Sequence, residues 1–216
     1  VTFADNHTIL TADEGEPRKG YGDTIESVDP KGSVSIINVS DLTSVQVGFE
    51  NYDANALIEK NIILGVTGSA IIAPQYDLEP EYIAVSFDGT TAYVSLQEAN
   101  AIAVLDVTRA EFTGIYSVGY EDYSTVPIDV VKSDGKYGAN TYKNLVGARM
   151  PDGIALYEKN GQTYLVTANE GDSREWGEEE EPNYYINEGS KNELTPTSGA
   201  SINLGAKEAI TILDPD

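Results

Sequence analysis

An internal repeat is the feature that most constrains how this chain can fold. Residues 9–15 recur as residues 165–171 and, more loosely, as residues 93–99. The three copies align without a gap, and each carries a glutamate at the same place: Glu14, Glu98 and Glu170. Because a repeat implies equivalent structural units, it limits the architecture before any single strand is assigned.

Each copy is the second strand of a predicted four-stranded unit. A short apolar run and a turn precede it, and the turns at Asp88-Gly89 and Asn160-Gly161 are strong hairpin signals. Third strands are predicted over residues 33–38, 101–106 and 209–214. Weaker fourth strands are predicted near residues 44–49 and 113–118. The unit is therefore an antiparallel meander.

The copies lie further apart than the ~40–50 residues of a minimal propeller blade, so the surplus must form loops. The sequence thus predicts an all-β fold, a partial β-propeller of about three four-stranded antiparallel blades, similar to YVTN or WD40-like repeats. Its long loop insertions are expected on one face. The single domain, residues 1–216, divides into blade 1 (about 1–50), an insertion (51–79), blade 2 (about 80–118), an insertion (119–150) and an incomplete blade 3 (about 151–216).

These strands are too few to close a ring. An open propeller exposes sheet edges, and such edges invite pairing with another chain. We therefore expect either further blades from a longer parent protein or a homo-oligomer formed through the open edges.

The charge balance restricts the partners. Lys and Arg number 13 and Asp and Glu number 36, which gives a net charge of −23. Such a charge repels nucleic acid and anionic membranes, and attracts cations; a merely solubilising surface explains it equally well. No apolar run reaches the ~20 residues of a membrane span, so no membrane insertion is expected in this segment.

The residue inventory directs any chemistry to oxygen ligands. Cysteine is absent, and the single histidine, His7, reads as a turn residue, so neither a thiolate site nor a Ser-His-Asp triad is expected. A short helix is predicted over residues 53–63, with Asp53 as its N-cap.

Five acids are expected to converge at the mouth of the central channel. This acidic ring consists of Glu14, Glu81, Glu98, Asp152 and Glu170. Calcium needs several oxygen ligands at once, and converging carboxylates with loop carbonyls supply them. Alternatively, the acids cap backbone amides or pair with arginine.

An arginine follows the glutamate at the same offset in the first and third copies, as Arg18 and Arg174, and Asp172 lies between Glu170 and Arg174. With the ring and Asp172 as metal ligands, the arginines could clamp a phosphate beside a cation. An internal salt bridge that organises a long loop explains the pattern too, and we favour it.

Four segments, residues 11–17, 79–86, 96–104 and 167–174, resemble the choice-of-anchor I bacterial surface proteins. That group is similar to the mesenchyme-specific cell-surface glycoproteins. The resemblance implies an exported or wall-attached propeller domain, in a family whose members are variously labelled alkaline phosphatase-like or phytase-like.

The sequence therefore predicts an extracellular, cell-surface binding module that takes calcium and, through it, a small-molecule or surface ligand or a partner. Glu14, Glu98, Glu170, Arg18 and Arg174 are its candidate ligand contacts. One alternative is a calcium-dependent phosphoesterase, and another is a structural surface scaffold.

Overall fold

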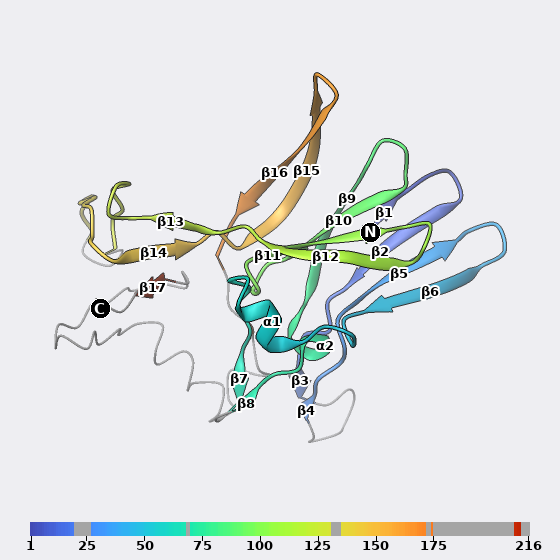
Figure 1. Cartoon of the computed structure of the whole chain (residues 1–216), viewed down its shortest axis with the longest axis horizontal. Helices are drawn as coiled ribbons and strands as arrows, with labels where there is room; N and C mark the ends of the chain where they lie inside the picture. The colour runs from blue at the N-terminus through green and yellow to red at the C-terminus, as the bar shows by residue number, and fades with distance from the viewer. Residues whose placement is uncertain (20–26, 68–69, 131–134, 172–173, 175–209, 213–216) are drawn as a thin grey trace.

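The fold was determined from a computed structural model that describes residues 1–19, 27–67, 70–130, 135–171, 174 and 210–212. Two four-stranded antiparallel sheets and a two-stranded hairpin follow one another along the chain and are fanned side by side (Figure 1). The sheets do not close into a ring. The prediction of an all-β, partial propeller is confirmed.

Blades 1 and 2 form where the repeat predicts them. Blade 1 comprises β1 (Thr2–Phe3), β2 (Thr8–Asp13), β5 (Ser33–Asn38) and β6 (Thr43–Gly48), in the spatial order β1-β2-β5-β6. Blade 2 comprises β9 (Pro80–Val85), β10 (Thr91–Leu96), β11 (Ala101–Asp106) and β12 (Glu111–Ser117), in the spatial order β12-β11-β10-β9. Each is the antiparallel meander expected from its alternating apolar pattern.

Blade 3 is a hairpin of β15 (Pro151–Lys159) and β16 (Gln162–Asn169). Its turn residues, Asn160 and Gly161, have φ values of 54° and 73°, the left-handed conformation that a tight hairpin turn requires. Beside it, β13 (Tyr120–Asp122), β14 (Leu145–Ala148) and β17 (Ile210–Ile212) form a three-stranded sheet.

The predicted third strand of blade 3 has a different partner. Residues 210–212 were expected beside β16, but β17 pairs antiparallel with β14. The insertion between blades 2 and 3 forms its own hairpin, β13–β14, and the free edge of β14 supplies the backbone partners that β17 needs.

The other insertions hold short elements: α1 (Ala54–Ile58), α2 (Pro74–Asp77), β3 (Arg18–Lys19) paired with β4 (Ser27–Val28), and β7 (Val66–Thr67) paired with β8 (Ala70–Ile71). The N-cap prediction is confirmed, since the Asp53 carboxylate accepts a hydrogen bond from the Ala56 amide at 2.9 Å. The helix ends at Ile58, short of the predicted residue 63, and the chain then turns through Asn61 at a φ of 61°. No helix in the described part of the chain is long and apolar enough to cross a membrane.

These short elements gather at one end of the blades, and the β1–β2, β5–β6 and β9–β10 turns lie at the other (Figure 1). We call the first the insertion end. A close backbone contact fixes one part of it, because a Cβ at Gly32, just before β5, would overlap the carbonyl oxygen of Leu78. The Gly32 amide also donates to the Gln75 carbonyl at 3.0 Å, which anchors α2 against blade 1.

The main core lies between blades 1 and 2. Leu10 and Val34 of blade 1 pack in one cluster with Val94 and Leu105 of blade 2, and all four are fully buried. At the outer strands the rings of Phe49 and Phe112 stack with centroids 4.6 Å apart. Because each such side chain contributes about 1.5–3 kcal/mol when buried, this interface holds the two blades at a fixed angle.

Candidate functional site

Arg174 lies at the centre of a group of carboxylates at the insertion end. Its Nε is 3.0 Å from Oε1 of Glu79, its Nη1 is 2.8 Å from Oδ1 of Asp77, and its Nη2 is 2.7 Å from Oδ1 of Asp29. The Arg174, Asp77 and Glu79 side chains are only 6%, 4% and 3% exposed. These four residues form the Arg174 cluster. The internal salt bridge, one of the two alternatives for this arginine, is present.

The cluster joins segments from all three copies of the repeat. Asp29 lies in the insertion of blade 1, between β4 and β5. Asp77 ends α2, where its second oxygen accepts a hydrogen bond from the Gly65 amide at 2.6 Å, and Glu79 directly precedes β9. Arg174 follows blade 3. One guanidinium therefore ties the third copy to the first two.

Burial changes the protonation of these carboxylates. It raises the pKa of Glu79 to about 9; Arg174 opposes the rise, and the charges of Glu98, Asp77 and Glu14 add to it. Burial also raises the pKa of Asp77 and of Asp29, again against the effect of Arg174. Burial is the main cause, and together with the neighbouring acids it favours the protonated form of Glu79 at neutral pH.

We expect the protein to lose stability as the pH rises from about 5 to 9. A carboxyl group whose pKa is raised by folding stabilises the fold fully below its unfolded pKa of 4.5, and this stabilisation disappears as the pH passes through the folded value of about 9. For a single proton the slope is at most about 1.4 kcal/mol per pH unit. Denaturant titrations across this range should show the slope reduced in Glu79→Gln, and an unchanged slope would contradict the assignment to Glu79.

Exposed turn aspartates should not mask this effect. Hydrogen bonds from neighbouring turn residues lower the pKa of Asp5, Asp41, Asp88 and Asp122. Any stability that these groups contribute is present above their unfolded pKa of about 3.8 and is lost only at more acidic pH.

Two members of the acidic ring act on the Arg174 cluster. Glu98 lies in the tight turn between β10 and β11, with its Oε2 atom buried, and Glu14 is an exposed residue that follows β2. Their charges both raise the pKa of Glu79. Glu14 and Glu98 are therefore near enough to Glu79 to act on its pKa.

The remaining ring members come from the innermost hairpins. Glu81 in β9 and Asp152 in β15 are half-buried. Glu170, just beyond β16, is exposed, and its amide donates to the Met150 carbonyl at 3.3 Å. Asp172 and the side chain of Arg18 lie outside the described residues, although the backbone of Arg18 is part of β3.

The strand register corrects the alignment of the glutamates. Asp13, the residue before Glu14, pairs with the first residue of β5. In blade 2 the residue that pairs with the first residue of β11 is Leu96, two before Glu98. Gln97 therefore occupies the place of Glu14, and Glu98 lies one residue further along.

Blade 3 agrees with blade 1. Asn169 pairs with the proline that opens β15, as Leu96 pairs with the proline that opens β9, so Glu170 also matches Gln97. The prediction of one shared position is thus wrong for Glu98. A gap-free alignment misses this shift because the first turn of blade 2 is one residue longer than that of blade 1. A shift of one residue moves each side chain to the opposite face of the sheet.

Sequence reasoning missed three of the four cluster residues: Asp29, Asp77 and Glu79. Glu79 did carry a signal, because it lies between Leu78 and Pro80, which are both fully buried. An acid inside an apolar run that must be buried needs a charge or a proton to balance it.

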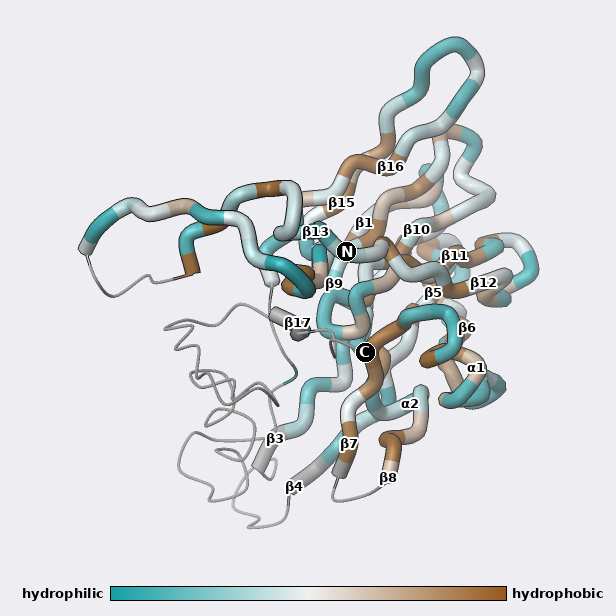
Figure 2. The backbone as a smooth tube through the Cα atoms, turned by 60° about the vertical axis from the view of Figure 1, so that its left-hand side comes forward, coloured by the Kyte–Doolittle hydropathy of each residue, from teal (hydrophilic) through white to brown (hydrophobic). Residues whose placement is uncertain are grey.

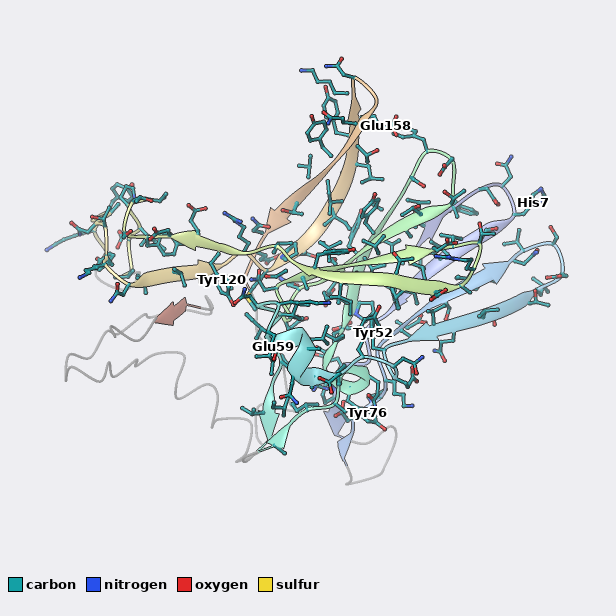
Figure 3. All side chains as sticks on the ribbon, viewed as in Figure 1. His7, Tyr52, Glu59, Tyr76, Tyr120 and Glu158 are labelled. Carbon is teal, nitrogen blue, oxygen red and sulfur yellow. The ribbon has the colours of Figure 1, made fainter. Side chains whose placement is uncertain are left out.

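The opposite end of the blades carries different features. His7 is exposed in the β1–β2 turn, as predicted, with Nδ1 3.1 Å from the Ser40 hydroxyl, and Figure 3 shows it far from Tyr76 of α2. A cavity of about 320 Å³ opens there between the turns of blades 1 and 2, next to Asp5 and Asp88. No member of the acidic ring lines it. Within the described ranges, no group of three or more Asp, Glu or His side chains is arranged to hold a metal ion.

Comparison with known proteins gives one match. The family model of the choice-of-anchor I domain matches residues 1–214. No curated protein and no solved structure matches the chain.

Proposed function

Because the chain belongs to the choice-of-anchor I family, a family of surface-associated bacterial domains, we propose that it is an extracellular binding module that takes up calcium at its insertion end. The bound cation would in turn recruit a surface ligand or partner. Glu14 and Glu98 are the proposed first contacts for calcium, with carbonyl oxygens of the neighbouring loops. Glu81, Asp152 and Glu170 are the further candidates.

The excess of carboxylates around Arg174 is the observation that supports this proposal. Asp29, Asp77 and Glu79 bond directly to the guanidinium, and the charges of Glu14 and Glu98 also act on Glu79. Even with Glu79 protonated, the one positive charge of Arg174 against the remaining acids leaves a negative field around the cluster. That field favours a hard cation, and calcium accepts irregular sets of six to eight oxygen ligands.

Calcium should therefore raise the melting temperature. Extracellular modules bind calcium with dissociation constants of about 10⁻⁴–10⁻³ M, so about 10 mM calcium should approach saturation. At a 100-fold excess over the dissociation constant the stabilisation is about 2.7 kcal/mol, which is roughly 5–10 °C for a chain of this size.

A matched pair of variants localises the effect. Glu98→Gln should lose most of the calcium-induced shift, because it removes one charge at the insertion end with little change in volume. Glu158→Gln should keep it, because Glu158 lies at the tip of the β15–β16 hairpin (Figure 3). The absence of any shift in the unmodified protein, or an equal shift in both variants, would count against the proposal.

The binding module is preferred to a phosphoesterase for a geometric reason. All three nitrogens of the Arg174 guanidinium bond to carboxylates, so a phosphate would have to displace at least one of them. Turnover of a generic phosphate ester that stops with chelator and in Glu98→Gln would reverse this preference. If neither calcium binding nor turnover is found, a structural scaffold is the remaining function.

A further inference from the structure

The cavity at the turn end of blades 1 and 2 lies away from the acidic ring and the Arg174 cluster. We call it the turn-end cavity. Its volume of about 320 Å³ is within the usual range of small-ligand sites. Blade 1 lines it with residues of β2, β5, β6 and the β1–β2 turn, and blade 2 lines it with residues of the β9–β10 and β11–β12 turns. The cavity therefore lies where the two blades meet.

One part of the cavity wall is apolar. Ile36 of β5 pairs with Leu10 of β2 and with Val45 of β6, so these three side chains share the face of blade 1 that is turned to blade 2. Leu10 is fully buried, whereas Ile36 and Val45 line the cavity and Val45 is 54% exposed. Val107 lines it from blade 2 and, like Ile36, packs against the main core. The apolar packing between the blades thus ends in an open apolar surface.

A polar row lies next to this surface, nearer the turns. Thr8 of β2 and Thr43 of β6 both pair with Asn38, which follows the apolar row by two residues on the same face of β5. Thr90 and Thr108 line the cavity from blade 2. These side chains carry hydroxyl and amide oxygens that accept hydrogen bonds. Figure 2 shows the same change along the blades, from hydrophobic stretches in the strands to mostly hydrophilic turns.

Two aspartates from neighbouring turns complete the lining. Asp5 lies in the β1–β2 turn and Asp88 in the β9–β10 turn. Hydrogen bonds from neighbouring turn residues lower the pKa of both, so both are ionised at neutral pH. The two turns are in close contact, because a Cβ at Gly89 would lie only 2.6 Å from the carbonyl oxygen of Ala4. The fold therefore brings two negative charges from different blades to one cavity.

The charge and the apolar wall together select an organic cation. Arg109 follows Thr108 in the β11–β12 turn, but its Nε is already paired with Oδ2 of Asp106 at 2.9 Å. An anion would be repelled by the aspartates and by the net charge of −23. A metal ion would gain nothing from the apolar wall, and calcium needs six to eight oxygen ligands. A cation with an apolar stem can use both parts of the lining.

We propose that the turn-end cavity binds a primary alkylammonium group, carried by a lysine side chain of a partner protein or by a free amine. The ammonium donates hydrogen bonds to the carboxylates of Asp5 and Asp88 and to the neighbouring hydroxyl oxygens. The alkyl chain packs along the apolar wall. This site is independent of calcium at the insertion end, since no member of the acidic ring lines the cavity.

Titration of the ¹⁵N-labelled whole chain with n-pentylammonium, followed by heteronuclear NMR at pH 7, tests the proposal. We expect the amide shifts to centre on residues that line the cavity, Gly89 and Thr90 among them, with a dissociation constant of about 1 mM. Raising NaCl from about 0.05 to 0.5 M should weaken binding, because salt screens the charges. Shortening the alkyl chain should weaken it by up to about fourfold for each buried methylene that is lost.

Matched variants separate the roles of charge and apolar wall. Asp5→Asn and Asp88→Asn each remove one charge and keep a side-chain oxygen that can accept the hydrogen bonds of the turn. Each should weaken binding by about tenfold or more, the loss of one charge-assisted hydrogen bond. Asp122→Asn changes a turn aspartate of the same kind outside the cavity and should bind normally. Val45→Thr, which keeps the side-chain volume, should reduce the gain from a longer alkyl chain.

A lysine derivative distinguishes the two sources of the ammonium group. Tighter binding of Nα-acetyl-lysine methylamide than of n-pentylammonium assigns the cavity to a lysine of a partner protein, and weaker binding assigns it to a free amine. The Nε-acetylated form carries no charge and should not bind. The proposal is overturned by the absence of shifts at about 20 mM n-pentylammonium, by equal binding of the uncharged form, or by equal losses in Asp88→Asn and Asp122→Asn.

Discussion

Replacement of Arg174 by methionine is expected to lower the free energy of unfolding by about 3–5 kcal/mol, the usual cost when one partner of a buried ion pair is removed. Methionine keeps much of the length of the side chain but leaves the Asp77 carboxylate, 4% exposed, without its counter-charge and Glu79, 3% exposed, without its guanidinium partner. Urea denaturation followed by circular dichroism measures the loss. It should be smaller at pH 5 than at pH 8, because the carboxyl groups can then take up protons.

Two comparisons isolate the buried charge as the cause. Arg109→Met removes an arginine that is 61% exposed and pairs with Asp106 at 2.9 Å, and should cost no more than about 1 kcal/mol. Adding Asp77→Asn and Glu79→Gln to Arg174→Met should recover part of the lost stability, since no charge then remains buried. A loss equal to that of Arg109→Met would show that Arg174 does not hold the insertion end together.

The second large effect is expected at Asn100. This fully buried side chain donates from Nδ2 to the Gly119 carbonyl at 3.0 Å and accepts from the Met150 amide through Oδ1 at 2.9 Å. Gly119 and Met150 lie at the two ends of the insertion between blades 2 and 3. Asn100→Ala leaves both backbone groups without this partner, at about 1–3 kcal/mol each, so the total loss should be roughly 2–5 kcal/mol.

The backbone conformation at Asn100 makes a smaller contribution to the stability loss in Asn100→Ala, and a control variant measures it separately. Its φ of 52° is left-handed, which asparagine tolerates better than alanine. Asn160 has a similar φ of 54° in the exposed turn of the β15–β16 hairpin, so Asn160→Ala measures the backbone term alone. If thermal or urea denaturation gave the two variants equal losses, the buried hydrogen bonds at Asn100 would have no measurable weight.

The repeat predicted the blades because its signals are local. Alternating apolar residues and Gly-containing turns lie within a few residues of one another, as does the Asp53 cap of α1, and the strands of blades 1 and 2 formed where these signals indicated. The register between the blades was harder to predict from the sequence. Whether Glu98 or Gln97 matches Glu14 depends on the length of the first turn of the blade. One extra turn residue hardly changes the apolar pattern, so the pattern does not reveal it.

The Arg174 cluster could not be predicted in the same way. Its hydrogen bonds connect Arg174 to residues 95, 97 and 145 positions away in the sequence, so they exist only after three insertions have packed together. Arg18 and Arg174 each follow the glutamate of their copy at the same distance in the sequence. This spacing predicted a salt bridge between an arginine and acidic residues, but it did not identify those residues. The pairing of β17 with β14 could not be predicted for the same reason. It needs the free edge of β14, which exists only after the insertion between blades 2 and 3 has folded.

Anomalous scattering from crystals grown with calcium, or with terbium in its place, tests the proposed function most directly. Calcium binding at the insertion end predicts one ordered peak at about 2.3–2.6 Å from carboxylate oxygens of Glu98 and Glu14. A saturated crystal with no peak at the insertion end, or with its cation only at the opposite end near Asp5 and Asp88, would contradict that function.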